Sequence, residues 1–212
     1  MANKKKASNG KMKWIIIALL LVAAMVVAAL YLVLPEEKAA GSAEPTDFVE
    51  INIENYGSIT AELYGGIAPA TVENFMKLVD EGFYDGLTFH RIISGFMIQG
   101  GDPMGNGMGG SDEKIKGEFQ ANGVENNISH IRGVLSMARS QLYDSASSQF
   151  FIMHADADYL DGQYAAFGRV LSGIEVVDAI CESTPVTDGN GSVAAENQPV
   201  ITSIRRIEKH AQ

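Results

Sequence analysis

The segment Phe89–Asp102 places a guanidinium among large apolar side chains. It reads FHRIISGFMIQGGD. Because side chains alternate between the two faces of a strand, Arg91 is expected to share a face with Phe89 and Ile93, opposite His90. An arginine on such a face is either a rim charge with a buried aliphatic stem or a hydrogen-bond donor in a site of low dielectric. The alternation alone leaves both interpretations open.

Other patterns that suggest chemistry lack the context which that chemistry needs. Gly105, Gly107 and Gly110 spell G-x-G-x-x-G, but no amphipathic helix follows to direct its N-terminus at a phosphate. The run HADADYLDG lacks the spacing and the final glutamate of an EF-hand, and the serines of SASSQFF are not set in a G-x-S-x-G turn. We therefore expect a glycine-rich loop, a turn with solvated acids, and no serine hydrolase.

The cysteine and histidine content argues against metals and cofactors. The chain has one cysteine, Cys181, and four scattered histidines. One cysteine cannot form an intrachain disulfide or a cysteine cluster for zinc, and the histidines show no metal-ligand spacing. We expect no metal site and no cofactor.

Charge is distributed unevenly along the chain. The formal net charge is −10, yet the first 34 residues contain five lysines and no acid, which leaves 11 basic against 26 acidic residues for the rest. So acidic a domain repels nucleic acid and anionic lipid headgroups, and neither is expected to be its partner.

Residues 14–34 form an uncharged apolar run of 21 residues, WIIIALLLVAAMVVAALYLVL. This length is sufficient for one helix to span the hydrocarbon core of a bilayer. The lysines of the basic tail, residues 1–13, predict a cytoplasmic N-terminus and an extracytoplasmic C-terminal domain. The sequence therefore predicts a single-pass protein of the cell membrane that contacts the lipid bilayer through residues 14–34.

A signal peptide is the alternative interpretation of this run. Its apolar region would normally be shorter, but cleavage near residues 39–41 or 41–43 would release a soluble domain. Residues 35–46, PEEKAAGSAEPT, are small and polar and are interpreted as a linker. The folded domain is expected over residues 47–209.

The domain is expected to be mainly β. Alternating apolar and polar residues over 48–53 and 59–63 predict a hairpin, and further strand-like runs follow. Helical spacing over 69–81, with Pro69 in the first turn and Gly82 just past the end, predicts an amphipathic helix. A second short helix is expected over 174–182. Many short strands with only two helices favour a barrel or sandwich over a βαβ fold.

The strand-like run beginning at Phe89 also carries a family signature. The pattern FHRII-x-x-F-M-x-Q-G-G-D resembles the signature of the cyclophilin family. The segments APATVENF, GVLSMA, SQFFI, YLDG and FGRV occur in the family's order across residues 47–209. The resemblance implies a closed eight-stranded antiparallel barrel capped by two α-helices, preceded here by the N-terminal transmembrane helix.

The resemblance also implies a site, residue by residue. The expected catalytic group comprises Arg91, Gln99, Phe96 and Phe151. Further substrate-binding positions are expected at His90, Met97, Gly107, Ala138, Arg139, Tyr159, Leu160 and Tyr164. In this assignment Gln99 orients Arg91, apolar side chains hold a proline ring, and the backbone at Ala138–Arg139 holds the substrate chain.

The implied activity is peptidyl-prolyl cis/trans isomerisation of X-Pro bonds. From the predicted topology alone, we expect it to act on unfolded or exported polypeptides at the outer face of the membrane. The alternative is a non-catalytic module that binds proline-containing segments in an envelope complex. Three positions depart from common family residues: Tyr159 replaces a tryptophan, Tyr164 a histidine and Arg139 an asparagine. Because an indole is absent at residue 159, the resemblance implies only weak binding of cyclosporin.

Overall fold

A computed structural model of the protein describes residues 44–208. Its strands are β1 (Asp47–Ile53), β2 (Gly57–Leu63), β3 (Phe89–Ile93), β4 (Met97–Gly100), β5 (Val134–Met137), β6 (Phe150–Met153), β7 (Ala166–Ser172) and β8 (Ile201–Arg206). The helices are α2 (Pro69–Asp80) and α3 (Ile174–Ser183), with single 3₁₀ turns η1 (Gln120–Asn122), η2 (Asp158–Leu160) and η3 (Ala195–Asn197). These bounds confirm the mainly β prediction and both expected helices.

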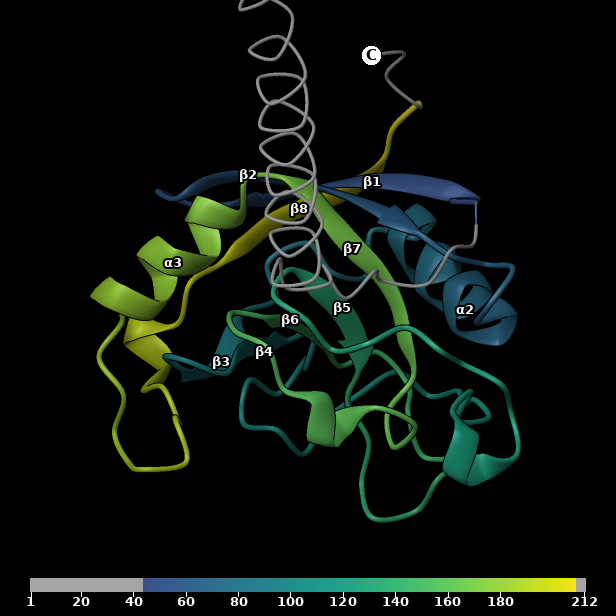
Figure 1. The fold of residues 1–212 in the computed structure, drawn as a ribbon. Coiled ribbons are helices and arrows are strands. Elements are labelled where there is room, and N and C mark those ends of the chain that lie inside the picture. The colour runs from purple at the N-terminus through teal and green to yellow at the C-terminus, as the bar shows by residue number, and fades with distance from the viewer. Residues whose placement is uncertain (1–43, 209–212) are drawn as a thin grey trace, which may run out of the picture. The chain divides into compact units, whose positions relative to one another are not determined.

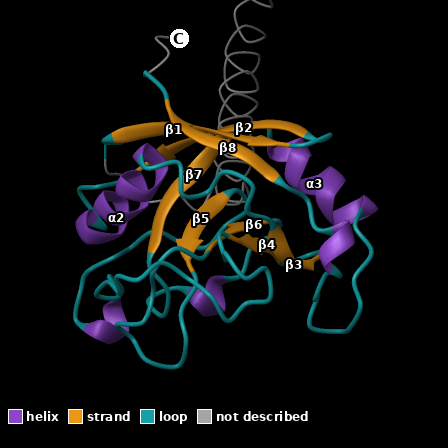
Figure 2. Cartoon of the chain, turned by 180° about the vertical axis from the view of Figure 1, so that it is seen from behind, coloured by secondary structure: helices purple, strands orange, loops and turns teal. Residues whose placement is uncertain are grey.

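The strands of this part of the chain form one antiparallel sheet in the order β3-β4-β6-β5-β7-β2-β1-β8. The expected hairpin is confirmed, because β1 and β2 pair with Ile51 opposite Ile59. Val49 and Ile51 are fully buried on the inner face, as the alternation in sequence predicts. The helices α2 and α3 lie at opposite sides of the curved sheet (Figures 1 and 2).

The two ends of the strand order, β3 and β8, meet without sharing a ladder. They approach through one isolated bridge, Thr88 to Val200, and the Phe89 N–H donates to the Pro199 carbonyl at 3.0 Å. Pro199 has no N–H to donate, so a continuous ladder cannot extend through it. The prediction of eight antiparallel strands is therefore correct, but full closure is not: the sheet is a half-barrel with a local bridge between its ends.

Aromatic side chains join α2 to the sheet. The ring of Phe75 on α2 lies 5.1 Å from Phe167, 5.2 Å from Tyr84 and 5.5 Å from Phe150, centroid to centroid. The N-terminus of α2 is capped from a distant loop, because the buried Glu118 carboxylate accepts hydrogen bonds from the Ala70 and Thr71 N–H groups. Such a carboxylate complements the positive end of the helix dipole and fixes the loop that carries Phe119.

The lone cysteine of the chain lies on α3. Cys181 is half-buried against the core, and burial raises the pKa of its thiol to about 11. It is therefore protonated at neutral pH, which is the less reactive form, and it packs as a small apolar residue.

Residues 44–208 contain no helix that is long and apolar enough to cross a membrane. The predicted basic tail (1–13), the transmembrane anchor (14–34) and most of the linker (35–46) lie outside the described residues. These assignments stay predictions.

Gly173 provides a test of the junction between β7 and α3. Its φ is +85°, and a Cβ there would lie 2.2 Å from the Ser58 carbonyl oxygen. Gly173→Ala is expected to lower the free energy of unfolding by about 2–4 kcal/mol, combining left-handed strain with overpacking. Gly66→Ala is the control, since nothing lies within 4 Å of its Cβ position. Urea denaturation should separate the two variants, and equal stabilities would contradict this account.

Candidate active site

A cavity of about 340 Å³ opens among β3, β4, β6 and the loops around them. Ten of the twelve predicted site residues line it: Arg91, Phe96, Met97, Gln99, Ala138, Arg139, Phe151, Tyr159, Leu160 and Tyr164. The structure thus brings together residues that lie up to 73 positions apart in the chain. We refer to this space as the apolar cavity.

Strand register aligns the central residues of the apolar cavity. Arg91 on β3 is opposite Gln99 on β4, and Gln99 is opposite Phe151 on β6. Residues opposite one another in antiparallel strands project to the same face. A guanidinium, an amide and an aromatic ring therefore stand in one row across three strands.

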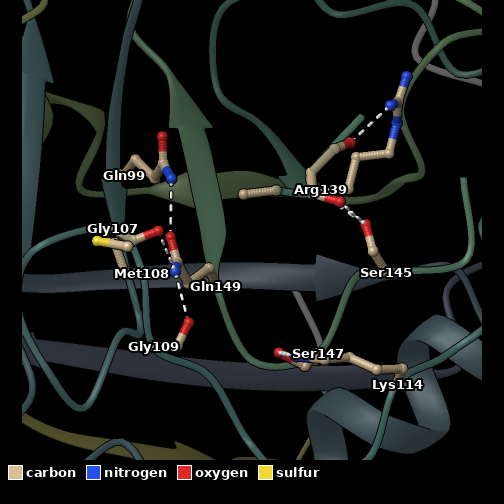
Figure 3. A pocket seen from close by; sticks show the side chains of 11 residues that line it. Gln99, Gly107, Met108, Gly109, Lys114, Arg139, Ser145, Ser147 and Gln149 are labelled. Carbon is tan, nitrogen blue, oxygen red and sulfur yellow. Dashed lines mark hydrogen bonds between the residues drawn. The ribbon is translucent and has the colours of Figure 1, made fainter. Parts of the chain in front are cut away.

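A chain of hydrogen bonds fixes both amides in this row. The Gln149 Nε2 group donates to the carbonyls of Gly107 (3.1 Å) and Gly109 (2.7 Å), so its Oε1 faces Gln99 and accepts from Gln99 Nε2 at 2.9 Å (Figure 3). Gln99 Oε1 is then left to accept from Arg91 Nη1 at 3.2 Å. We call the sequence from the glycine-rich loop through Gln149 and Gln99 to Arg91 the amide relay.

Asn190 holds the other side of the guanidinium. Its carbonyl accepts from Arg91 Nε at 2.9 Å, and its side-chain oxygen accepts from Arg91 Nη2 at 3.2 Å. A guanidinium has five N–H groups in one plane, so these contacts and the amide relay leave one N–H on each terminal nitrogen. Burial lowers the pKa of Arg91 from its ordinary value, but an arginine stays charged in proteins.

The loop of Asn190 is itself bonded along β3. The Asp188 carboxylate accepts from the N–H groups of Asn190 and Ser192, and the Ile92 N–H donates to the Gly191 carbonyl at 2.8 Å. Gly191 adopts φ +80°, and a Cβ there would lie 2.3 Å from the Ile92 carbonyl oxygen. The close approach of the loop to β3 therefore requires glycine at this position.

Aromatic rings form the walls of the apolar cavity. The Phe151 ring packs edge-on to Tyr164 at 5.9 Å and stacks on the imidazole of His130 at 6.1 Å. Phe96 lies 6.0 Å from Tyr159, which is exposed at the mouth. Such a lining suits a compact apolar ring and not a charged group.

His130, Ser136 and Asp161 are arranged like a hydrolytic triad but cannot act as one. His130 Nδ1 lies 2.9 Å from Asp161 Oδ1, and its Nε2 lies 3.0 Å from Ser136 Oγ. The Ser136 side chain is completely buried, so no substrate reaches the hydroxyl. Instead, hydrogen bonds with Ser136 and Asp161 hold the His130 ring, which stacks on Phe151.

Arg139 does not project freely into the apolar cavity. Its guanidinium lies 4.6 Å from the centroid of Tyr164 and 5.1 Å from those of Phe119 and Tyr143, and it donates to the carbonyls of Gln163 and Ser140. The Arg139 backbone N–H and the Ala138 carbonyl have no partner among the described residues. The role predicted for this backbone, to hold a substrate chain, stays a prediction.

The two remaining predicted residues, His90 and Gly107, lie outside the apolar cavity. His90 is buried, with no hydrogen-bond partner for either ring nitrogen among the described residues, and Gly107 passes beside it on the glycine-rich loop. Gly107 reaches the site through its carbonyl, which accepts from Gln149.

Sequence reasoning missed Asn190 and Gln149. Asn190 is in the run DGNGS, a turn pattern, and Gln149 directly precedes the apolar run FFIM. Neither pattern indicates which distant side chain the residue contacts.

Comparison with known proteins gives a consistent assignment. The model of the family "Cyclophilin type peptidyl-prolyl cis-trans isomerase/CLD" matches residues 48–206. Peptidyl-prolyl cis-trans isomerase B of Bacillus subtilis is 49% identical over 123 residues, 58% of this chain and 82% of the relative. A peptidyl-prolyl cis-trans isomerase of Helicobacter pylori is 44% identical over 128 residues, 59% of this chain and 76% of the relative.

The fold is also similar to a solved structure. The crystal structure of a cyclophilin type peptidyl-prolyl cis-trans isomerase from Cryptosporidium parvum superposes with a TM-score of 0.68 at 31% identity. The superposition covers 77% of this chain and 98% of that one.

The buried histidines predict a pH dependence of stability. Burial lowers the pKa of both His90 and His130, so the unfolded chain binds more protons than the folded one and stability falls as the pH drops below about 6.5. Between pH 7.5 and 5.5 each histidine is expected to remove up to about 1.4 kcal/mol from the free energy of unfolding. His90→Leu should reduce that loss in urea titrations at the two pH values, and an unchanged pH dependence would contradict this account.

Proposed function

The chain belongs to the cyclophilin-type peptidyl-prolyl cis-trans isomerase family, and we propose that Arg91 is its catalytic group and, from the predicted membrane topology, that exported polypeptides are its substrates. The isomerase activity and the proline-containing substrates follow from the family model and the named relatives. The observation that carries the catalytic proposal is the double hold on Arg91 by Gln99 and Asn190 at the apolar cavity.

The reaction that such a site catalyses is rotation about an amide bond. Its barrier of ~18–20 kcal/mol arises from resonance that keeps the C–N bond planar. In the transition state the prolyl nitrogen becomes pyramidal and its lone pair can accept a hydrogen bond. A group that binds this twisted state better than the planar one accelerates the reaction, and no nucleophile, acid or base is needed.

Arg91 can provide that preference. One of its remaining N–H groups would donate to the prolyl nitrogen only once the amide twists, while the apolar cavity holds the ring. A hydrogen bond to a charged group contributes ~1.5–3 kcal/mol, or roughly 10–150-fold in rate. Anchoring of the ring and of the backbone at Ala138–Arg139 would supply the remainder. Preorganisation matters because a donor that is already oriented does not need to reorganise during the reaction.

The alternative of a binding module explains less of the geometry. Holding a proline segment requires the apolar walls, but not a guanidinium with two oriented N–H groups. The family assignment and this arrangement both favour turnover.

Removal of the guanidinium tests the catalytic proposal. Arg91→Ala is expected to lower kcat/KM by on the order of 10²–10³, the effect of losing one preorganised transition-state donor. Arg91→Lys should not restore activity, since an ammonium lacks the planar fork that Gln99 and Asn190 hold. The measurement is protease-coupled isomerisation of a proline peptide, with thermal unfolding of each variant as the folding control. Near-normal activity of folded Arg91→Ala would remove this residue from the mechanism.

The proposed setting is the outer face of the cell membrane, with residues 14–34 as the anchor and residues 1–13 in the cytoplasm. The support for it is the uncharged run, its flanking lysines and the acidic domain that follows. There the enzyme would assist the folding of exported proteins.

Protease accessibility tests the topology. External protease added to intact cells after wall removal should degrade the domain and leave a short N-terminal fragment in the membrane. Protection of the whole chain until lysis would contradict the topology. A soluble product beginning near residue 41 or 44 would indicate cleavage instead of anchoring.

Cyclosporin affinity tests the role of Tyr159, which is exposed at the mouth of the apolar cavity. We expect weak binding, since a tyrosine lacks the indole N–H and its larger face. Tyr159→Trp should tighten the dissociation constant roughly 5–150-fold, equivalent to about 1–3 kcal/mol. An unchanged value in an isothermal titration would show that this position does not limit affinity.

A further inference from the structure

One wall of the apolar cavity is carried by an exposed turn between β3 and β4. Phe96 is the last residue of this turn, and its ring centroid lies 6.0 Å from that of Tyr159. Ser94 and Gly95, which precede it, are exposed, and nothing lies within 4 Å of a Cβ at Gly95. Packing thus supports the turn only weakly. Its hydrogen bonds to other segments must therefore determine where the Phe96 ring lies.

His154, directly after β6, makes these hydrogen bonds. Its backbone N–H donates to the Phe96 carbonyl at 2.9 Å, as the backbone of most residues could. Its side chain adds a bond that depends on residue type, because Nδ1 accepts from the Gly95 N–H at 2.8 Å. A ring nitrogen that accepts from a backbone N–H has no proton of its own. The N–H of this imidazole is therefore at Nε2.

A closed set of contacts orients the imidazole. His154 Nε2 lies 3.2 Å from Asp178 Oδ1 on α3, within reach for donation. The other oxygen, Asp178 Oδ2, accepts from Arg132 Nη2 at 2.7 Å, and Arg132 Nη1 donates to the His154 carbonyl at 2.7 Å. The hydrogen bond from Arg132 lowers the pKa of Asp178, so a carboxylate faces the ring at neutral pH. We refer to His154, Asp178 and Arg132 as the imidazole clamp.

Helix α3 provides a fixed base for the imidazole clamp. Val177 and Ile180 on this helix are completely buried in the core, and α3 lies beside β3 in both views of the fold (Figures 1 and 2). A side chain on such a helix is held more precisely than one on a loop. Asp178 can therefore fix the ring that the exposed turn leans on.

Stability alone explains this arrangement poorly. The Arg132 and Asp178 side chains are 39% and 34% exposed, and ion pairs with such access to water contribute little to the free energy of unfolding. No group of three histidine, cysteine or acidic side chains in residues 44–208 could hold a metal ion, so metal binding does not explain it either. His154 does not line the apolar cavity. Any effect on the reaction must therefore pass through the turn.

We propose that His154 is a positioning residue, whose imidazole, oriented by Asp178 and Arg132, fixes the β3–β4 turn and thereby the Phe96 ring in the apolar cavity. The proposal rests on the isomerase function above and adds a determinant of ring-size selectivity. A displacement of about 1 Å can cost roughly 10²-fold in rate, and a well-shaped apolar pocket discriminates one methylene by roughly 10–200-fold. A loosened wall should lower the rate with proline and tolerate a larger ring.

Two amide substitutions separate the two ring nitrogens. Asparagine at residue 154 can place an oxygen near the position of Nδ1, facing Gly95, whereas glutamine places its amide near the position of Nε2. The substrates are two peptides that differ only in proline or pipecolate, whose ring has one more methylene. Their kcat/KM values would be measured by NMR exchange with the full-length chain in lipid nanodiscs.

The native protein should prefer proline over pipecolate by roughly 10–200-fold. His154→Gln should lower kcat/KM for proline about 5–30-fold, less than the cost of a full 1 Å displacement, and should lower the proline-to-pipecolate ratio by at least about threefold. His154→Asn should keep both values within about twofold of native. A side chain that only fills space would not distinguish the two amides in this direction.

Asp178→Ala tests the base of the imidazole clamp, and Asp85→Ala is its matched control. Asp85 forms a similarly exposed ion pair with Arg205, and neither residue lines the apolar cavity. Asp178→Ala should lower the selectivity ratio in the same direction as His154→Gln, and Asp85→Ala should not. The ¹⁵N shifts of the His154 ring should show the proton at Nε2 in the native protein. Thermal unfolding would establish that each variant is folded.

Equal effects of asparagine and glutamine at residue 154 would overturn the proposal. A native ratio in both His154→Gln and Asp178→Ala would do so too, as would a native ring protonated at Nδ1. If His154→Gln does not fold, Asp178→Ala against its control decides. If the native protein isomerises neither peptide, the isomerase proposal fails. The ratio of the two peptides' dissociation constants in the same variants would then still decide whether His154 positions the wall.

Discussion

The orientation of one guanidinium is the constraint on which the rest of the site depends. Arg91 has the amide relay on one side and Asn190 on the other. Because the Gln149 amide must donate to two carbonyls of the glycine-rich loop, each following amide has only one favourable orientation. A contact made at the backbone of that loop thereby determines which way Gln99 presents its oxygen. Because the guanidinium is planar, the bonds that Gln99 and Asn190 accept from it also fix the direction of its two remaining N–H groups.

The orientation of Arg91 and Phe151 is maintained by the register of β3, β4 and β6 and by the side chains packed behind Phe151. The row from Arg91 through Gln99 to Phe151 exists because β3, β4 and β6 pair in one register, and a slip of one residue would turn these side chains to the opposite face. The buried His130 and Ser136 stand behind Phe151 and keep its ring in place. Catalysis by a preorganised donor and ring tolerates little displacement, so a stiff sheet is a suitable scaffold.

Much of this could be predicted from the sequence, because the main contacts are local or periodic. The segment Phe89–Asp102 contains both Arg91 and its partner Gln99, and the family resemblance already implied that Gln99 orients Arg91, as the pairing of β3 with β4 allows. The contact with Asn190 could not be predicted, since 99 residues separate it from Arg91 and only the folded loop brings them together. Closure of the barrel was overestimated, because Pro199 has no N–H and interrupts the pairing between the ends of β3 and β8. Arg139 was expected at the substrate backbone, but no pattern indicated that three rings would surround its side chain.

The most direct test of this account asks whether Asn190 acts through Arg91. Asn190→Ala removes the side-chain acceptor but keeps the backbone carbonyl, and Asn190 does not line the apolar cavity. Isomerisation kcat/KM would be measured for Asn190→Ala in the native background and in the Arg91→Ala background. We expect a loss of about 5–30-fold in the first, equivalent to about 1–2 kcal/mol, and no further loss in the second. Equal losses in both backgrounds would contradict the claim that orientation of Arg91 sets the rate.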